Sequence, residues 1–243
     1  MTCVVNVKKL VKTYGNVQAV RDLSFHLNHG QTLGLLGGNG AGKTTTLSMM
    51  LGLVIPTSGQ IDIFGYDMLT NRFPALARMN FSSPYVSMPG RLTVQQNLRV
   101  YARFYDVAHP YDRADELIDE LDLSKQRHQQ TGDLSAGQQT RVSVAKSLIN
   151  KPGLLILDEP TASLDPDSAD WMRTYLKDYQ RQTGAALVLA SHNMNEVERL
   201  CDDVLMMKDG RIEDQGTPKT LIARYGHQNM EEVFLAIARK GSV

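Results

Sequence analysis

A short stretch rich in glycine, GGNGAGKT at residues 37–44, constrains the fold of this chain more than any other feature. An apolar run typical of a strand precedes it, and spacing typical of a helix follows it. Glycines let backbone N–H groups wrap closely around an anion, and the N-terminus of the following helix adds the positive end of its dipole. The pattern therefore predicts a phosphate-binding loop between a strand and a helix, within an α/β fold.

Two side chains of this loop carry specific expectations. Lys43 would supply a mobile cation for the β- and γ-phosphates of a nucleotide, and Thr44 would offer a hydroxyl oxygen to Mg²⁺. A chance match would occur in roughly one chain of this length in a hundred, and the flanking strand and helix make it rarer still. The loop residues expected to bind the nucleotide are Gly37, Gly38, Asn39, Gly40, Ala41, Gly42, Lys43, Thr44 and Thr45.

A second apolar run, LLIL at 154–157, leads directly into Asp158 and Glu159. Ligands of open α/β sheets bind at the carboxyl ends of the strands, so we expect Asp158 to hold Mg²⁺ and Glu159 to orient or deprotonate an attacking water. His192 follows the apolar run 185–191, which should lie beside the first run and bring this histidine to the γ-phosphate. The alternatives are an acidic turn that caps the next helix and a histidine satisfied at a strand end.

Composition narrows the classes of function. The 243 residues carry 26 Lys and Arg against 26 Asp and Glu, a formal net charge of zero, so no nucleic-acid partner is expected. The two cysteines, Cys3 and Cys201, are far apart in sequence, which argues against a disulfide framework and favours a reducing cytosol. No window approaches the roughly 20 apolar residues that a membrane-spanning helix needs. The N-terminus also lacks the apolar stretch of a signal peptide.

The order of the expected elements gives the fold class. We expect an α/β fold with a P-loop NTPase core, a mixed and mainly parallel sheet, an N-terminal antiparallel β part and an inserted α-helical lobe. A single domain would span 1–243, with a helical subdomain at about 80–150 and a C-terminal helical tail at about 220–243. Thr93 is a candidate N-cap inside the lobe, and Asp209-Gly210 marks a hairpin turn after the last buried strands.

The motif LSAGQ at 134–138 has no nucleophile–base pair, metal-ligand spacing or charge, yet an apolar helical pattern follows it directly. It resembles LSGGQ, the signature of ATP-binding cassette (ABC) proteins. Together with the motifs above, in the same order, it makes nearly the whole chain similar to the nucleotide-binding subunit of an ABC transporter. The resemblance adds three roles: Tyr14 would stack on adenine, Asp165 would belong to the D-loop, and His192 would be the switch histidine.

This resemblance implies an assembly as well as a reaction. Two copies would form an ATP-dependent, head-to-tail homodimer, in which the signature loop of one copy covers the γ-phosphate on the other copy's phosphate-binding loop. Within the signature, Ser135 would donate a hydroxyl, Gly137 would allow close backbone approach, and Gln138 belongs to the same contact. The implied cofactors are ATP and Mg²⁺, and the implied reaction is ATP hydrolysis, with Lys43, Glu159 and His192 as its catalytic residues.

The resemblance further implies a motor that drives a separate transmembrane permease, with the chain peripheral on the cytoplasmic face of the membrane. The C-terminal segment NMEEVFLAIARKG resembles the tail of export-type subunits, so export is expected. The main alternative is a soluble ABC ATPase of DNA repair or translation. Such proteins usually carry coiled-coil or zinc insertions, or two cassettes, and none is visible here. A P-loop kinase is a third class, which the signature and LDEP argue against.

Two departures from the family pattern are expected to matter little. Gly38 stands where proline is common, and Ala136 replaces a glycine of the signature.

The third departure concerns the Q-loop glutamine, which should fall near position 84, where Pro84 stands after Ser83. We therefore expect Mg²⁺ to be held mainly by Thr44, Asp158 and waters, and basal ATPase to stay low until a membrane partner reshapes the 80–94 loop. In that loop Tyr85, Val86 and Met88 would either form an apolar docking surface or pack on the helical lobe.

Overall fold

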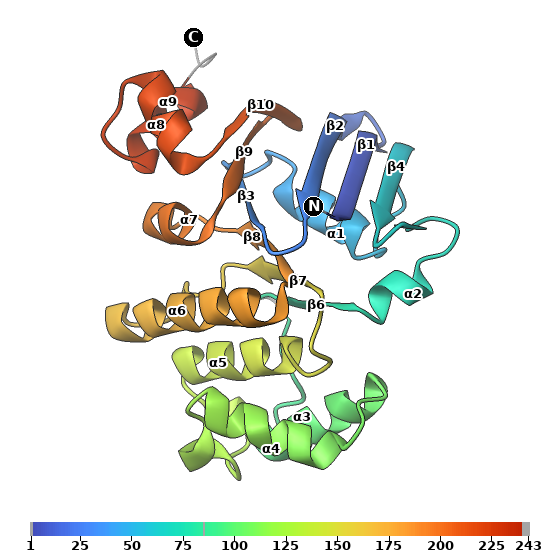
Figure 1. Ribbon diagram of the computed structural model, residues 1–243, viewed down its shortest axis with the longest axis vertical. Helices are drawn as coiled ribbons and strands as arrows, with labels where there is room; N and C mark the ends of the chain where they lie inside the picture. The colour runs from blue at the N-terminus through green and yellow to red at the C-terminus, as the bar shows by residue number, and fades with distance from the viewer. Residues whose placement is uncertain (1, 85, 240–243) are drawn as a thin grey trace.

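The strands of this computed structural model, which describes residues 2–84 and 86–239, form two sheets. The first is antiparallel, in the order β2-β1-β4-β5, and stands beside α1 in Figure 1. Its long strands alternate buried and exposed residues, as a sheet with one face on the core requires. Its strands are β1 (Cys3–Tyr14), β2 (Val17–Asn28), β4 (Ser58–Ile63) and β5 (Tyr66–Asp67). The predicted N-terminal antiparallel part is confirmed.

The second sheet has the order β10-β9-β3-β8-β7-β6, and every neighbouring pair is parallel except β9–β10. Its strands are β3 (Thr32–Gly37), β6 (Met79–Ser82), β7 (Leu154–Asp158), β8 (Ala186–Ala190), β9 (Asp203–Lys208) and β10 (Arg211–Gly216). Every residue of β3 and β8 is buried, because layers cover both faces of this sheet. The predicted α/β class with a mixed, mainly parallel sheet is confirmed, and so is the β9–β10 hairpin.

Two apolar cores lie on the opposite faces of this sheet, and β7 contributes to both. Leu154 and Ile156 pack with α1 (Lys43–Met50) and the antiparallel sheet, whereas Leu155 and Leu157 pack with the helices of the other face. Those helices are α6 (Pro166–Thr183), α7 (Met194–Leu200), α8 (Pro218–Tyr225) and α9 (Met230–Arg239). The carboxyl ends of the parallel strands are therefore held rigidly from both sides.

The segment inserted between β6 and β7 is mainly helical and lies at the end of the molecule away from α8 and α9 (Figure 1). A short α2 (Phe73–Leu76) and strand β6 precede α3 (Val94–Phe104), α4 (Pro110–Glu120) and α5 (Ala136–Ser147), with 3₁₀ turns at Ser124–Gln126 and Thr131–Asp133. Thr93 caps α3 as predicted, because its side chain accepts a hydrogen bond from Gln96 N. Strand β6 lies at the start of the predicted helical subdomain of about 80–150, yet it belongs to the central sheet. The division into one domain with a helical subdomain therefore stays a prediction.

The predicted C-terminal tail contains α8 and α9, while its last residues, 240–243, lie outside the described part of the chain. Met230, Val233 and Ile237 of α9 face the core. The Lys208 ammonium of β9 donates to the carbonyl oxygens of Ile237 and Ala238 near the end of α9, at 3.2 and 2.9 Å. Among the helices of residues 2–84 and 86–239, none is long and apolar enough to span a bilayer.

Candidate functional site

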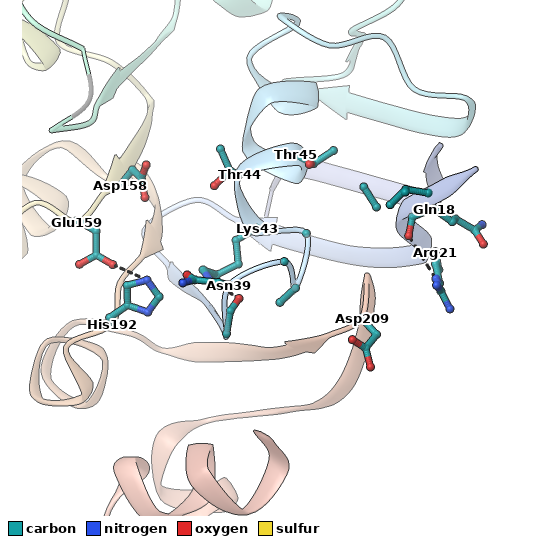
Figure 2. Close-up of a pocket in the computed structure, with 16 residues that line it drawn as sticks. Gln18, Arg21, Asn39, Lys43, Thr44, Thr45, Asp158, Glu159, His192 and Asp209 are labelled. Atoms are coloured by element: carbon teal, nitrogen blue, oxygen red, sulfur yellow. Dashed lines mark hydrogen bonds and ion pairs between the residues drawn. The ribbon is translucent and has the colours of Figure 1, made fainter. Parts of the chain in front are cut away.

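A pocket of about 650 Å³ opens at the carboxyl ends of β3, β7 and β8. One wall is the glycine-rich loop and the start of α1, and another is Asp158, Glu159 and His192 (Figure 2). Residues of the glycine-rich loop that line it are Gly38, Asn39, Gly40, Ala41, Gly42, Lys43, Thr44 and Thr45, all of which were expected to bind the nucleotide. Gly37 lies behind this lining, at the end of β3.

The backbone of this loop depends on glycine at two positions. A Cβ atom on Gly37 would lie 2.4 Å from Met207 O, and one on Gly42 would lie 2.6 Å from Ala19 O. Gly42 also has φ +98°, a conformation that glycine adopts readily. The first turn of α1 has no capping side chain and no acidic residue. Its amide groups and dipole therefore face the pocket without a competing anion from that turn, as an anion site requires.

Lys43 stands at the centre of the pocket in Figure 2. Its ammonium group donates to the carbonyl oxygens of Gly37 and Gly38, at 2.5 and 3.1 Å. Burial lowers the pKa of Lys43, and the nearby carboxylates of Glu159 and Asp158 oppose that shift. The ammonium can exchange two neutral carbonyl partners for phosphate oxygens without leaving the loop.

Asp158 and Glu159 follow one another at the end of β7. Burial raises the pKa of both carboxyl groups. The Ser83 hydroxyl donates to Asp158 Oδ2 at 3.3 Å, so the serine before Pro84 occupies the neighbourhood in which the family's glutamine was expected. Hydroxyl and carboxylate oxygens are hard ligands, and this donor set fits Mg²⁺.

Glu159 lies beside His192, as the sequence predicted from the placement of their strands. Strands β7 and β8 are parallel neighbours with Asp158 opposite Ala190, which brings the two following loops together. His192 Nε2 lies 3.6 Å from Glu159 Oε1, and both side chains face the pocket (Figure 2). Glu159 has φ +51°, an uncommon conformation for a residue with a side chain, and Glu159 N donates to Ala190 O at 2.8 Å.

The signature residues lie elsewhere in this copy of the chain. Ser135 caps α5: its Oγ accepts from Gln138 N at 3.4 Å, and the Gln138 side chain accepts from Ser135 N at 3.0 Å. Because Ser135 Oγ accepts from the backbone, its own O–H proton is directed elsewhere. Asp165 caps α6 by accepting from Ser168 N. Within the described residues, the lining of the 650 Å³ pocket includes none of Ser135, Gly137, Gln138 and Asp165.

Gly137 packs tightly against the D-loop that ends at Asp165. A Cβ atom at this position would lie 3.3 Å from Ser163 O and 3.4 Å from Leu164 Cδ2. Glycine is therefore favoured at position 137 within this copy as well, whereas Ala136 is exposed and its methyl group meets no such obstacle.

Tyr14 lies at the rim of the pocket and does not line it. It is 48% exposed and pairs across the β1–β2 hairpin with Val17, which does line the pocket. The Lys12 ammonium lies 4.8 Å from the centre of its ring. An exposed aromatic face next to the pocket is available for stacking on a base.

The sequence did not identify several lining residues. Gln18 and Arg21 lie at the end of the pocket away from His192, and Asp209 approaches from the β9–β10 turn (Figure 2). The turn at Asp209-Gly210 was predicted, but its position here depends on β9 pairing with β3. Arg21 N donates to Gly210 O at 2.7 Å, which joins the two hairpins. Their closeness in sequence to Tyr14 was the only signal that could have placed Gln18 and Arg21 at the pocket.

Comparison with known proteins agrees with this geometry. The model of the family "ABC transporter" matches residues 20–162. The bacitracin transport ATP-binding protein BcrA of Bacillus licheniformis is 35% identical over 215 residues, covering 87% of this chain and 69% of that protein. The Nod factor export ATP-binding protein I of Cupriavidus metallidurans is 36% identical over 224 residues, covering 91% and 74%.

Solved structures share the fold across most of the chain. A structure described as the ATP binding subunit of an ABC transporter superposes with a TM-score of 0.89 at 25% identity, covering 97% of this chain and 100% of that one. The dimeric post-hydrolysis state of the cassette MJ0796, bound to ADP and Pi, superposes with a TM-score of 0.79 at 24% identity, covering 88% and 98%, and shows the fold alone. By its sequence and its fold, this chain belongs to the ABC transporter family as an ATP-binding domain.

Proposed function

We propose that this chain hydrolyses ATP and thereby drives export through a separate membrane-spanning subunit. One observation supports the catalytic part most strongly. A phosphate-binding loop with its lysine, two carboxyl groups and a histidine line a single pocket, and His192 lies 3.6 Å from Glu159. These groups come from β3, β7 and β8, so the sheet brings them together rather than local sequence.

The residues divide the work of hydrolysis between them. Backbone N–H groups of the loop and the Lys43 ammonium would bind the phosphates, and Tyr14 would stack on adenine. Thr44 and Asp158 would hold Mg²⁺, which supplies positive charge against the developing phosphate charge when bound. Glu159 would accept a proton from the attacking water, and burial, which raises its pKa, makes it a stronger base than an exposed carboxylate. His192 would position the γ-phosphate beside Glu159.

The position of the signature supports a composite site between two copies. Ser135 heads α5 with its helix N-terminus exposed, and the lining of this copy's nucleotide pocket, within the described residues, does not include it. A head-to-tail homodimer would place that end of α5 over the γ-phosphate of the second copy. The cassette MJ0796 is described as dimeric in its structure bound to ADP and Pi.

Export is the direction that the relatives support. One is named a bacitracin transport protein and the other a Nod factor export protein. A role in DNA repair or translation has no comparable support, so we do not propose it. Bound to a separate membrane-spanning subunit, the chain would lie peripherally on the cytoplasmic face of the membrane.

The loop before α3 is our candidate for contact with that subunit. Val86 is 48% exposed, whereas Met88 is partly buried against the core on the helical side, and Tyr85 lies outside the described residues. Packing therefore accounts for Met88, and Val86 is the part of this loop available to a partner.

The test is phosphate release by the purified chain in the presence of ATP and Mg²⁺. Lys43→Ala should lower phosphate release by at least about a hundredfold, because no other cation of the loop offsets the phosphate charge. Lys219→Ala, at an exposed position in α8, is the matched control and should behave as wild type. Equal release by wild type and Lys43→Ala would contradict the assignment of this pocket.

A further inference from the structure

Behind the catalytic pocket lies a buried carboxyl group that the proposed mechanism does not use. Glu196, in α7, has no exposed surface. Its neighbours Thr161 and Ser191 are 5% and 1% exposed, so the cluster is closed to bulk water. A wholly buried glutamate is rare unless it is paired or functional.

The contacts of Glu196 reach both loops that carry catalytic residues. Thr161 Oγ1 donates to Glu196 Oε1 at 3.0 Å, and Thr161 follows Glu159 by two positions. Burial raises the pKa of Glu196, and hydrogen bonds from the side chains of Ser191 and Thr161 oppose that shift. Ser191 directly precedes His192. The carboxyl group of Glu196 thus binds the loop after β7, and the backbone N of Glu196 donates to Asn193 Oδ1 in the loop after β8 at 3.3 Å.

Ser191 also affects the pKa of Glu159. Burial is the main cause of the raised pKa of Glu159, and a hydrogen bond from the Ser191 side chain partly lowers it. The Ser191 hydroxyl further accepts a hydrogen bond from Asn193 N at 3.0 Å, which fixes its orientation. Hydrogen bonds therefore run from Glu196 N to Asn193 Oδ1 and from Asn193 N to Ser191 Oγ, next to His192.

The cluster stabilises the fold poorly. Glu196 Oε2 has no hydrogen-bond partner among the described residues, and neither has Arg173 Nε, although Arg173 is the cation that acts on the Glu196 charge. A buried carboxyl group with an unpaired oxygen destabilises a protein relative to an apolar side chain of similar size. A purely structural role would be met better by methionine or leucine.

The backbone conformation of Glu159, by contrast, depends on contacts with its surroundings. It has φ +51°, and conformations of this kind persist only where the surroundings hold them. Its backbone is tied to β8 through Ala190 O, and Ala162 N donates back to Glu159 O at 3.3 Å. The hydrogen bond from Thr161 to Glu196 anchors the same turn from the core side.

We propose that Glu196 is a positioning residue for ATP hydrolysis, which holds the turn of Glu159 in register with His192 by binding Thr161. The inference rests on the proposed ATPase function. Glu196 itself does not touch the nucleotide, because it lies outside the pocket lining and is fully buried. Its removal should therefore alter turnover and leave nucleotide binding on the glycine-rich loop unchanged.

Two substitutions at this position separate positioning from packing. Glu196→Gln keeps an oxygen that accepts from Thr161, whereas Glu196→Met keeps the volume and removes the acceptor. We expect Glu196→Met to lower kcat by about tenfold or more, with the KM for ATP within about twofold of wild type, because the misplaced groups act mainly after binding. Glu196→Gln should retain kcat within about threefold of wild type.

A second residue keeps the test valid if Glu196→Met does not fold. Thr161→Val removes the hydroxyl donor at nearly constant volume and should lower kcat in the same way. Thr161→Ser, which keeps the hydroxyl donor, should keep kcat near that of wild type. In the double variant of Glu196→Met and Thr161→Val, the fall in kcat should not exceed that of the more affected single variant, because both remove the same hydrogen bond.

The matched control is Gln180→Met in α6. Gln180 is 5% exposed and donates to Thr32 Oγ1 at 2.8 Å, far along the sheet from the pocket. This control should lower thermal stability without lowering kcat. Wild-type kcat in folded Glu196→Met or Thr161→Val would overturn the inference, and so would equal losses in Glu196→Gln and Glu196→Met. Absence of ATP hydrolysis by the wild type would instead refute the proposed function itself.

Discussion

At the scale of single residues, Glu159 combines two unusual properties. Its side chain is largely buried, which raises the pKa of its carboxyl group, and its backbone lies in the left-handed region. Both follow from its place at the end of β7, where the chain turns sharply after a fully buried strand. The turn aims the side chain at the pocket and at His192 instead of at solvent.

Glu159→Gln should retain ATP binding and lower phosphate release by about a hundredfold or more, because the amide cannot accept the proton of the attacking water. ATP binding can be measured with a fluorescent analogue and release with a coupled assay. Glu198→Gln is the matched control, since Glu198 does not line the pocket and its carboxylate accepts a hydrogen bond from Met230 N. Release near the wild-type rate in Glu159→Gln would show that another group is the base.

At the scale of elements, α5 connects the signature to the side of the pocket at which we propose that Mg²⁺ binds. Ser135 heads the helix, and further along it Ser143 and Lys146 contact β6: the Ser143 and Ser82 hydroxyls lie 2.9 Å apart, and Lys146 Nζ donates to Phe81 O at 2.7 Å. Strand β6 leads directly to Ser83 beside Asp158. A shift of α5 would therefore be passed to the metal site through β6.

Substitution of Ser83 tests the contact between this loop and Asp158, the proposed Mg²⁺ ligand. Ser83→Ala removes the hydroxyl that donates to Asp158, so the Mg²⁺ concentration for half-maximal ATPase should rise by about threefold to tenfold. Ser83→Gln, which restores the family's glutamine one position early, should lower that concentration if the longer side chain reaches the metal. Ser87→Ala, in an exposed part of the same loop, is the control. Identical Mg²⁺ dependence in Ser83→Ala and Ser87→Ala would contradict this role.

Lys146 gives α5 a pH-dependent stability. Burial lowers the pKa of Lys146 from 10.5 to about 8, so above pH 8 the unfolded chain binds more protons at this site than the folded chain does. Stability from this group therefore rises with pH between about 8 and 10.5. Between pH 7 and 9.5, wild type should gain about 2 kcal/mol of unfolding free energy relative to Lys146→Met. Urea unfolding of both proteins measures this difference.

Lys125→Met, at an exposed position in the same lobe, controls for the loss of a lysine and should show no such change with pH. Parallel pH profiles for wild type and Lys146→Met would mean that Lys146 stays fully charged in the folded protein.

At the scale of the whole molecule, each copy contains a nucleotide pocket and, apart from it, a signature helix. The proposed composite site between two copies would explain why Ser135 lies outside its own copy's pocket. The chain by itself has a formal net charge of zero, so association should depend on the bound nucleotide and not on global charge attraction.

The Glu159→Gln variant should be a dimer in saturating ATP and a monomer without it, as measured by multi-angle light scattering. The bound nucleotide would join the two copies, and the absence of hydrolysis would preserve the complex. Adding Lys43→Ala to this variant should abolish the dimer, since the phosphates lose their cation. A monomer at saturating ATP would refute the homodimer and would point to a different cassette as the partner.

The sequence by itself determined what depends on neighbouring residues. The glycine-rich loop, the carboxylates after a buried strand, the cap at Thr93 and the turn at Asp209-Gly210 are set by local backbone conformation and hydrogen bonding, which short sequence patterns report. The α/β class followed from the alternation of such segments.

Only the tertiary structure decided which segments meet. The placement of Arg21 and Asp209 at the pocket, of Ser83 against Asp158 and of Glu196 behind both catalytic loops depends on the strand order β10-β9-β3-β8-β7-β6. The contacts of Arg21 with Gly210, of Ser83 with Asp158 and of Thr161 with Glu196 each join residues more than 30 positions apart. They are determined by the packing of strands and helices into one core, which no local pattern encodes.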